Sequence, residues 1–162
     1  MSRENRKAAV IALGGNALSP AGERSTIFDQ FRHTRESLKP IVALARDGWD
    51  VCIVHGNGPQ VGDELVRNEE ARASVEPLPL GVLVAATAGW IGYMIQQSLE
   101  NALRAAGSDR RVVTVLTQVV VARDDSALLH PSKFVGHELS AERARELAVA
   151  GVATAKDGNG RV

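Results

Sequence analysis

The sequence has little of several features that would define a class of protein at once. Its 162 residues include one cysteine, Cys52, so no intramolecular disulfide framework can form, and we expect a buried free thiol in a cytosolic protein. Nineteen basic residues balance nineteen acidic ones, so no net field attracts nucleic acid or an anionic membrane surface. The opening MSRENRK lacks the apolar segment of a signal peptide.

Long hydrophobic runs are also scarce. The longest one, residues 80–95, is shorter than the roughly 20 residues that a membrane-spanning helix requires. It therefore predicts a buried helix, and no membrane partner is expected. Gly89 and Gly92 would let another element approach this helix closely, so an oligomer interface is a second use open to it. The histidines show no spacing typical of a metal site, so none is predicted.

Apolar β-branched segments alternate with helical patterns along the chain. We expect strands at residues 8–13, 50–54, 111–122 and 152–156, the third too apolar to be an exposed edge and the last leading into half of a hairpin. We expect helices at residues 26–48 (with a kink or junction at Pro40), 63–73, 80–107 (ending at Gly107) and 141–151 (capped by Ser140). The alternation predicts one α/β domain, a three-layer α/β/α sandwich with a mainly parallel central sheet.

Two glycine-rich loops follow the first two expected strands. They contain Gly14, Gly15 and Asn16 in the first loop and Gly56, Asn57 and Gly58 in the second. At the carboxyl ends of neighbouring parallel strands, such loops face one crevice, where bare backbone N–H groups and asparagine amides can hold a carboxylate or phosphoryl oxygen. One glycine pair is more often a tight turn, but the repetition favours an anion site. Neither loop matches a Walker or dinucleotide fingerprint.

Five segments together carry a family resemblance. VIALGGNAL, VHGNGPQVGDEL, GWIGYMIQQSLENAL, VVTVLTQVVVARDD and HPSKFVG resemble, in order and approximate spacing, the amino-terminal half of carbamate kinases, members of the amino acid kinase superfamily. The resemblance implies a homodimeric α/β/α enzyme that transfers a phosphoryl group reversibly between ATP and carbamate, giving carbamoyl phosphate and ADP with magnesium.

The resemblance also assigns roles to residues. It implies that residues 14–16 surround the transferred phosphoryl group and that residues 56–58 receive the carbamate and phosphoryl oxygens. Ala12 stands where related kinases carry a lysine, and Lys133, in a protruding loop near residues 123–140, takes the place of the catalytic lysine. The chain departs from the family pattern at Thr87 to Gly89 and at residues 134–138.

Carbamate kinases are about twice as long as this chain. Residues 1–162 are therefore interpreted as a truncated amino acid kinase-like domain, the half that binds carbamate or carbamoyl phosphate. The residues that bind ATP, ADP and magnesium are expected in a carboxyl half that is absent here. Three interpretations stay open: an acceptor half that is inactive alone, one half of a split kinase that needs a separate nucleotide-binding half, or an anion-binding or dimerising module without catalysis.

Overall fold

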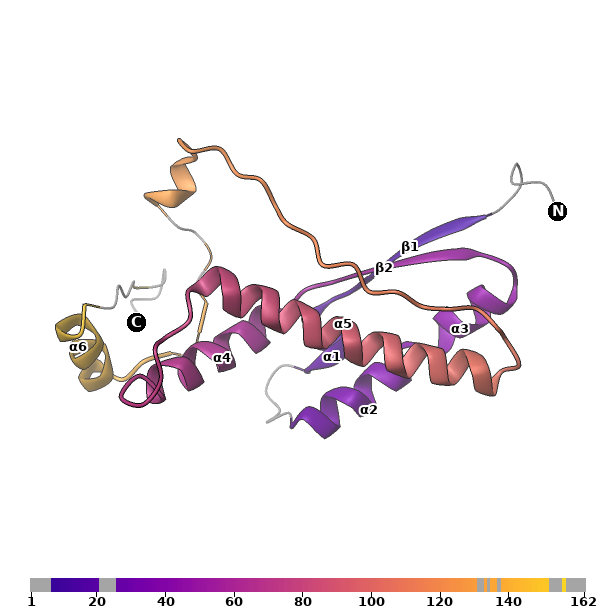
Figure 1. Cartoon of the computed structure of the whole chain (residues 1–162), viewed down its shortest axis with the longest axis horizontal. Coiled ribbons are helices and arrows are strands. Elements are labelled where there is room, and N and C mark those ends of the chain that lie inside the picture. The colour runs from indigo at the N-terminus through magenta and orange to yellow at the C-terminus, as the bar shows by residue number, and fades with distance from the viewer. Residues whose placement is uncertain are drawn as a thin grey trace.

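The computed structural model describes residues 7–20, 26–130, 133, 135–136, 138–151 and 156. Its elements follow one another along the chain as β1 (Ala8–Leu13), α1 (Gly15–Leu18), α2 (Ile27–Ser37), α3 (Lys39–Arg46), β2 (Asp50–His55), α4 (Gly58–Glu70), α5 (Leu80–Ala105), the 3-10 helix η2 (Ser126–Leu128) and α6 (Ala141–Val149) (Figure 1). The strand expected at residues 152–156, apart from Lys156, and the half hairpin after it lie outside the described residues.

The strands β1 and β2 form a parallel pair. Their register runs from Ala8 opposite Asp50 to Leu13 opposite His55. Alternate side chains point to opposite faces of such a pair. One face, which includes Leu13, joins the hydrophobic core, whereas Val10 on the other face is 74% exposed.

The exposed face of the strand pair overturns one expectation. Cys52 lies opposite Val10 in the register and is itself exposed. The prediction of a buried thiol is therefore wrong, because it assumed that both faces of the strand would be covered. In the part of the chain that the structure describes, Val10 and Val54, at 74% and 47% exposure, stay open on that same face.

The core lies between the strands and the helices α2, α3 and α5, which Figure 1 shows beside one another. Its buried members are Leu13, Leu18, Leu38, Ile41, Ala45, Ile91, Met94, Ile95, Leu99 and Leu103. Half of them come from α5, which confirms that its apolar run is a core helix. The α/β class with a parallel sheet is confirmed. In the described residues the helical layer packs on one face of the strand pair.

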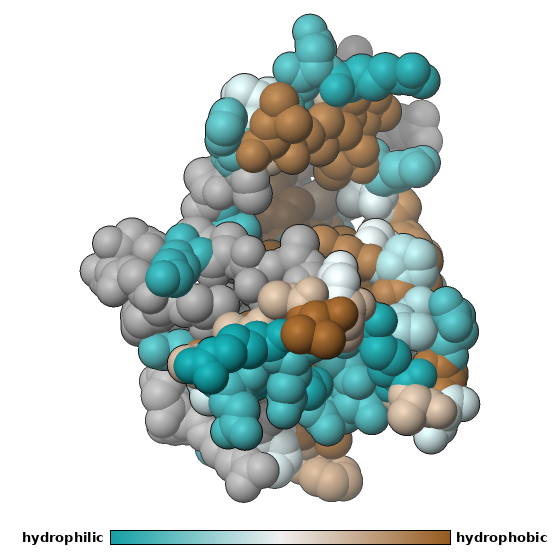
Figure 2. Space-filling view, turned by 90° about the vertical axis from the view of Figure 1, so that its left-hand side faces the viewer, coloured by the Kyte–Doolittle hydropathy of each residue, from teal (hydrophilic) through white to brown (hydrophobic). Residues whose placement is uncertain are grey.

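Residues 111–122 do not form the buried strand that the sequence predicts. They carry no regular secondary structure, and Val113 and Val120 are 80% and 94% exposed. A strand needs a neighbouring strand to bond its backbone, and among the described elements β1 and β2 pair only with each other. Figure 2 shows hydrophobic surface near the top of the molecule, where Figure 1 places η2 together with the chain that leads into it.

Local signals set the ends of the helices as predicted. Thr26 caps α2 in a capping box with Asp29, and the junction expected at Pro40 separates α2 from α3. Gly107 ends α5 with a φ of 74°, in the left-handed region that favours glycine, and Ser140 caps α6. None of the described helices combines the length and the apolarity needed to cross a membrane.

Candidate functional site

The two predicted glycine loops meet at one edge of the strand pair. Because β1 and β2 are parallel and in register to Leu13 and His55, both loops leave the sheet at the same end. The amide of Gly56 donates a hydrogen bond to the carbonyl oxygen of Leu13 at 3.4 Å. A Cβ placed on Gly15 would lie 3.6 Å from Cγ of Pro59. The prediction that the two loops lie next to each other is confirmed.

Three of the loop glycines leave open space. A Cβ atom on Gly14, Gly56 or Gly58 would have no neighbour within 4 Å. None of the three has a positive φ, so the backbone conformation does not itself require glycine. The missing side chains instead leave the main chain accessible, as an anion-binding loop needs.

The second loop leads directly into α4, which begins at Gly58, earlier than the helix expected from the sequence. Asn57 is the N-cap, and its carbonyl oxygen accepts the first helical hydrogen bond, from the amide of Val61 at 2.9 Å. Helical geometry leaves the amides of Gly58 and Gln60 without partners inside the helix, while Pro59 has no N–H. The partial positive charge of a 13-residue helix therefore faces the space beside the glycines.

The side chain of Asn57 is already engaged. Its Nδ2 donates to Oγ1 of Thr87 at 2.9 Å and to the carbonyl oxygen of Val84 at 3.1 Å. Thr87 is fully buried in α5 and donates its own hydroxyl to the preceding turn. Asn57 therefore fixes the loop to α5, and the expected role of its amide as a donor to an anion is replaced by a positioning contact.

Thr87 was missed as a functional residue by the sequence reasoning, which noted it only as a departure from the family pattern. The signal that could have found it is the single threonine inside the uncharged run of residues 80–95. A buried polar side chain needs a partner from another element, and here that partner is the glycine loop. Thr87 is thus the residue of α5 that holds the loop in place.

A second polar contact fixes α4. Gln60 and Gln30 are 3% and 6% exposed, and Nε2 of Gln60 donates to Oε1 of Gln30 at 3.0 Å. This bond connects the first turn of α4 with α2. Together with the contact between Asn57 and Thr87, it ties the start of α4 to two helices of the core.

The remaining predicted site residues are less closely defined. Asn16 lies in α1 within the first loop, and its side chain is outside the description. Lys133 is exposed, and no contact of it with either loop is seen. Its loop nevertheless approaches α4, since a Cβ on Gly62 would lie 3.2 Å from Cα of Gly136. In the described residues no three His, Cys, Asp or Glu side chains gather as metal ligands would.

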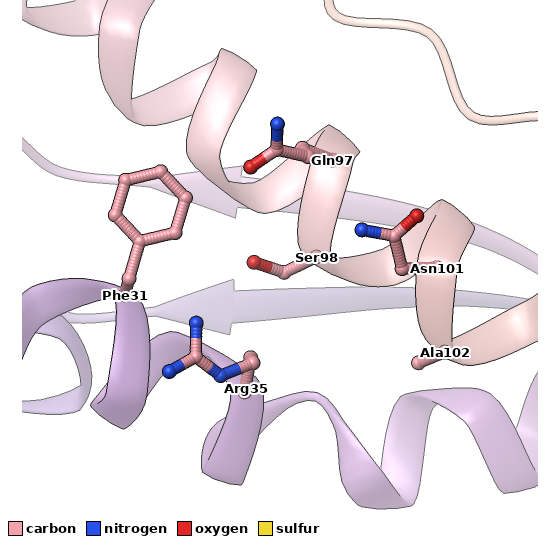
Figure 3. Close-up of a pocket in the computed structure, with 6 residues that line it drawn as sticks. All are labelled: Phe31, Arg35, Gln97, Ser98, Asn101 and Ala102. Carbon is pink, nitrogen blue, oxygen red and sulfur yellow. The ribbon is translucent and has the colours of Figure 1, made fainter. Parts of the chain in front are cut away.

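Two cavities lie away from the glycine loops. One of about 210 Å³ opens between α2 and α5. Its lining residues are Phe31 and Arg35 from α2 and Gln97, Ser98, Asn101 and Ala102 from α5 (Figure 3). It includes no residue of the glycine loops. The candidate site is therefore an open edge of the strand pair and not an enclosed pocket.

Comparison with known proteins identifies relatives, although no family model matches the chain. It is 41% identical over 144 residues to a carbamate kinase of Pyrococcus furiosus, covering 88% of this chain and 46% of the relative. It is 44% identical over 144 residues to a carbamate kinase of Escherichia coli strain K12, covering 89% of this chain and 46% of that relative. The chain thus spans about half the length of the curated relatives that it matches.

Solved structures agree with the sequence comparison. A carbamate kinase of Giardia lamblia, bound to AMP-PNP, superposes with a TM-score of 0.83 at 33% identity over 96% of this chain and 50% of that one. A protein of Aeropyrum pernix K1 gives a TM-score of 0.86 at 35% identity over 96% of this chain and 50% of that one.

The parallel strand pair, its helical layer and its two glycine loops belong to the α/β class of amino acid kinases. Within that class the chain is similar to carbamate kinases, over about half of their length.

Proposed function

We propose that this chain supplies the acceptor half of a carbamate kinase-like phosphotransferase, which moves a phosphoryl group reversibly between ATP and carbamate. One observation carries the proposal: two open glycine loops meet at the carboxyl ends of β1 and β2, beside the start of α4. Carbamate and carbamoyl phosphate are small anions, and bare amides at a helix N-terminus suit their oxygens. The family relationship supports this choice of substrate.

The loops act mainly through their backbone. We assign the amides of Gly14 and Gly15, with Asn16, to the transferred phosphoryl group, and those of Gly56 and Gly58 to the carbamate. Phosphoryl transfer is catalysed largely by positioning and by donors aimed at the charged oxygens. The hydrogen bonds of Asn57 support this role, because they hold the second loop against a buried helix before any ligand arrives.

Lys133 is proposed as the catalytic cation. The close approach of Gly136 to Gly62 supports this assignment, because it keeps the segment that carries Lys133 against the first half of α4. A lysine that approaches the transferred group from a loop can neutralise its charge and exclude water.

We propose that the nucleotide is bound outside this chain. ATP or ADP is expected by family membership, since the Giardia lamblia relative was solved with AMP-PNP. In the described residues no three His, Cys, Asp or Glu side chains gather as metal ligands would, and we derive no step through magnesium. The nucleotide and its metal are expected on a region equivalent to the part of the relatives that residues 1–162 do not match.

A homodimer and a cytosolic location stay predictions. The apolar side chains of α5 that face outward, among them Val82 at 46% and Tyr93 at 59% exposure, are the surface we expect a second copy to cover. Light scattering of the purified chain would measure its mass directly.

Calorimetric titration tests the proposed function. We expect the purified chain to bind carbamoyl phosphate and not Mg-ADP. Binding of Mg-ADP would contradict the placement of the nucleotide site outside residues 1–162. Absence of carbamoyl phosphate binding would contradict the acceptor site itself.

The variant Gly58→Ala tests where the anion binds. Its added methyl group meets no protein atom within 4 Å, so the fold should be unchanged. The methyl group enters the space assigned to the ligand, and we expect carbamoyl phosphate to bind about tenfold more weakly or worse. Gly81→Ala is the matched control, because a Cβ there is equally unobstructed but lies on α5, outside the two loops. Equal affinities of the two variants would place the anion elsewhere.

A further inference from the structure

The cavity between α2 and α5 contains a buried hydroxyl that the fold does not use. Ser98 of α5 is 6% exposed, and among the described residues its Oγ takes part in no hydrogen bond. Buried hydroxyls normally have a partner. Thr34 of α2 and Thr87 of α5 follow this rule, because each donates to a carbonyl oxygen of the preceding turn. Figure 3 shows Oγ of Ser98 directed into the cavity instead.

A guanidinium group without a carboxylate partner lines the same cavity. Arg35 lies in the last turn of α2, and within the described part of the chain it forms no ion pair. Other arginines do: Arg32, Arg72 and Arg143 each pair with a carboxylate at 3.0 to 3.2 Å. The six described lining residues include no acidic side chain. The positive charge of Arg35 is therefore not neutralised at the cavity.

The amide of Asn101 is a third donor at this cavity. Its side chain forms no hydrogen bond with the described residues, and in Figure 3 its nitrogen lies on the side of Ser98. Gln97 differs, because its Nε2 already donates to the hydroxyl of Tyr93 at 2.9 Å. A guanidinium, a hydroxyl and an amide that lack partners thus line one space.

These donors favour a carboxylate as the ligand. A guanidinium group can bind both oxygens of a carboxylate, and one positive charge balances one negative charge. A phosphate dianion would keep a second charge uncompensated. The remaining walls are apolar, with Ala102 on α5 and Phe31 on α2, and Phe31 packs against the core. The volume of about 210 Å³ is below the about 300–1,000 Å³ of pockets for drug-sized ligands, so the ligand is small.

We propose that this cavity is a second ligand site, which binds a small organic carboxylate. The carboxylate group lies between Arg35 and Ser98, with Asn101 as a further donor. The apolar body of the ligand lies against Phe31. This inference is independent of the proposed function, because it uses no residue of the glycine loops.

The second site is also separate from the loops in space. Ser98 follows Thr87 by about three turns of α5, which is about 16 Å along the helix axis. Thr87 is the residue that holds the second glycine loop. A ligand at Ser98 therefore leaves the proposed acceptor site open.

Titration with benzoate tests the proposal. Benzoate combines one carboxylate with a flat ring that can pack on Phe31. In nuclear magnetic resonance spectra of the isotope-labelled 162-residue chain, benzoate should shift the amide signals of residues 31–35 and 97–102. We expect a dissociation constant of about 1 mM or tighter, and binding of the uncharged benzamide and of inorganic phosphate about tenfold weaker.

Replacing Arg35 tests the role of its charge. Arg35→Gln should weaken benzoate binding by about tenfold, because the ligand loses its charged partner. Arg104→Gln is the matched control, since Arg104 is an exposed arginine in the last turn of α5 that does not line the cavity. It should leave the affinity for benzoate unchanged.

Replacing Ser98 separates binding from folding. Ser98→Ala should weaken benzoate binding by about fivefold, because the ligand loses one hydrogen bond. The same variant should raise the midpoint of urea unfolding, because it removes a buried hydroxyl without a partner and alanine favours the helix. A lower midpoint or an unchanged affinity for benzoate would contradict the assignment of Ser98.

Four further results would overturn the second site. They are no shift of the expected amide signals at about 10 mM benzoate, equal affinities for benzoate and benzamide, binding of phosphate as tight as that of benzoate, and equal affinities of Arg35→Gln and Arg104→Gln for benzoate. Carbamoyl phosphate is then added to the chain saturated with benzoate. Displacement of benzoate would place it in the glycine loops and would also contradict the second site.

Discussion

At the residue scale, the buried hydroxyl of Thr87 positions the second glycine loop by accepting a hydrogen bond from Asn57. Asn57 stands in the glycine loop, but its Nδ2 is directed to Thr87 and Val84 of α5. A loop that must hold an anion benefits from such a fixed contact, because its ordering is then complete before the ligand binds. The backbone amides beside Asn57 remain available for the ligand.

Replacing Thr87 should therefore loosen the loop. Thr87→Val keeps the shape of the side chain but removes the acceptor of Asn57 Nδ2. We expect a loss of about 1 kcal/mol in the free energy of unfolding, because a partly buried amide loses one partner, together with weaker carbamoyl phosphate binding. Urea unfolding and calorimetry measure the two effects. Thr87→Ser is the control, since it keeps the hydroxyl and should restore binding. A Ser variant as impaired as the Val variant would assign the effect to packing.

At the element scale, the helix α2 starts with a titratable cap. The carboxylate of Asp29 accepts hydrogen bonds from the hydroxyl of Thr26 at 2.6 Å and from its amide at 3.1 Å. Arg32 donates a further bond to it at 3.1 Å. These contacts, with that from the Thr26 hydroxyl the strongest, lower the pKa of Asp29 from 3.8 to about 2.

The lowered pKa predicts how α2 responds to acid. A carboxyl group whose pKa is lower in the folded than in the unfolded chain stabilises the fold above its unfolded pKa. This stabilisation should be complete above pH 3.8 and should disappear as the pH falls toward about 2. We expect Asp29→Asn to be less stable than the unmodified chain at neutral pH and the difference to shrink across that interval. Urea unfolding over a pH series measures it, and a difference that stays constant with pH would contradict this account.

The elements also show what could be predicted from the sequence. The helix ends at Thr26, Gly107 and Ser140 were found because caps are local, as were the two glycine loops at the ends of their strands. Burial was harder to predict. Cys52 and residues 111–122 were expected inside the protein because they are apolar. Burial also depends on which other elements cover a strand, and the apolarity of the strand alone does not predict those elements. Thr87 was missed for a related reason, since its partner is 30 residues away in the chain.

At the scale of the whole molecule, the described residues combine an ordered edge, where the two glycine loops meet, with apolar surfaces that are exposed to solvent. The second glycine loop and the start of α4 are fixed by contacts to α5 and α2. In contrast, Val10 and Val54 on the outer face of the strand pair, and Val113 and Val120 after α5, are exposed. The same division separates the proposed chemistry, because carbamate needs only the loops and phosphoryl transfer also needs a nucleotide. Binding of carbamoyl phosphate is therefore expected of this chain alone, whereas turnover is expected to need a nucleotide site as well.

Lys133 should matter only once the molecule is complete. Lys133 is exposed in this chain, so Lys133→Ala should leave the free energy of unfolding unchanged. In a protein completed with the part of the Pyrococcus furiosus relative that this chain does not match, we expect kcat to fall by about a hundredfold, because one cation aimed at the transferred phosphoryl group is lost. Lys39→Ala is the matched control, since it removes an exposed charge from α3. The coupled assay follows ATP formation from carbamoyl phosphate and ADP. If both variants kept the unmodified rate, Lys133 would be an ordinary surface lysine and another group would supply the positive charge.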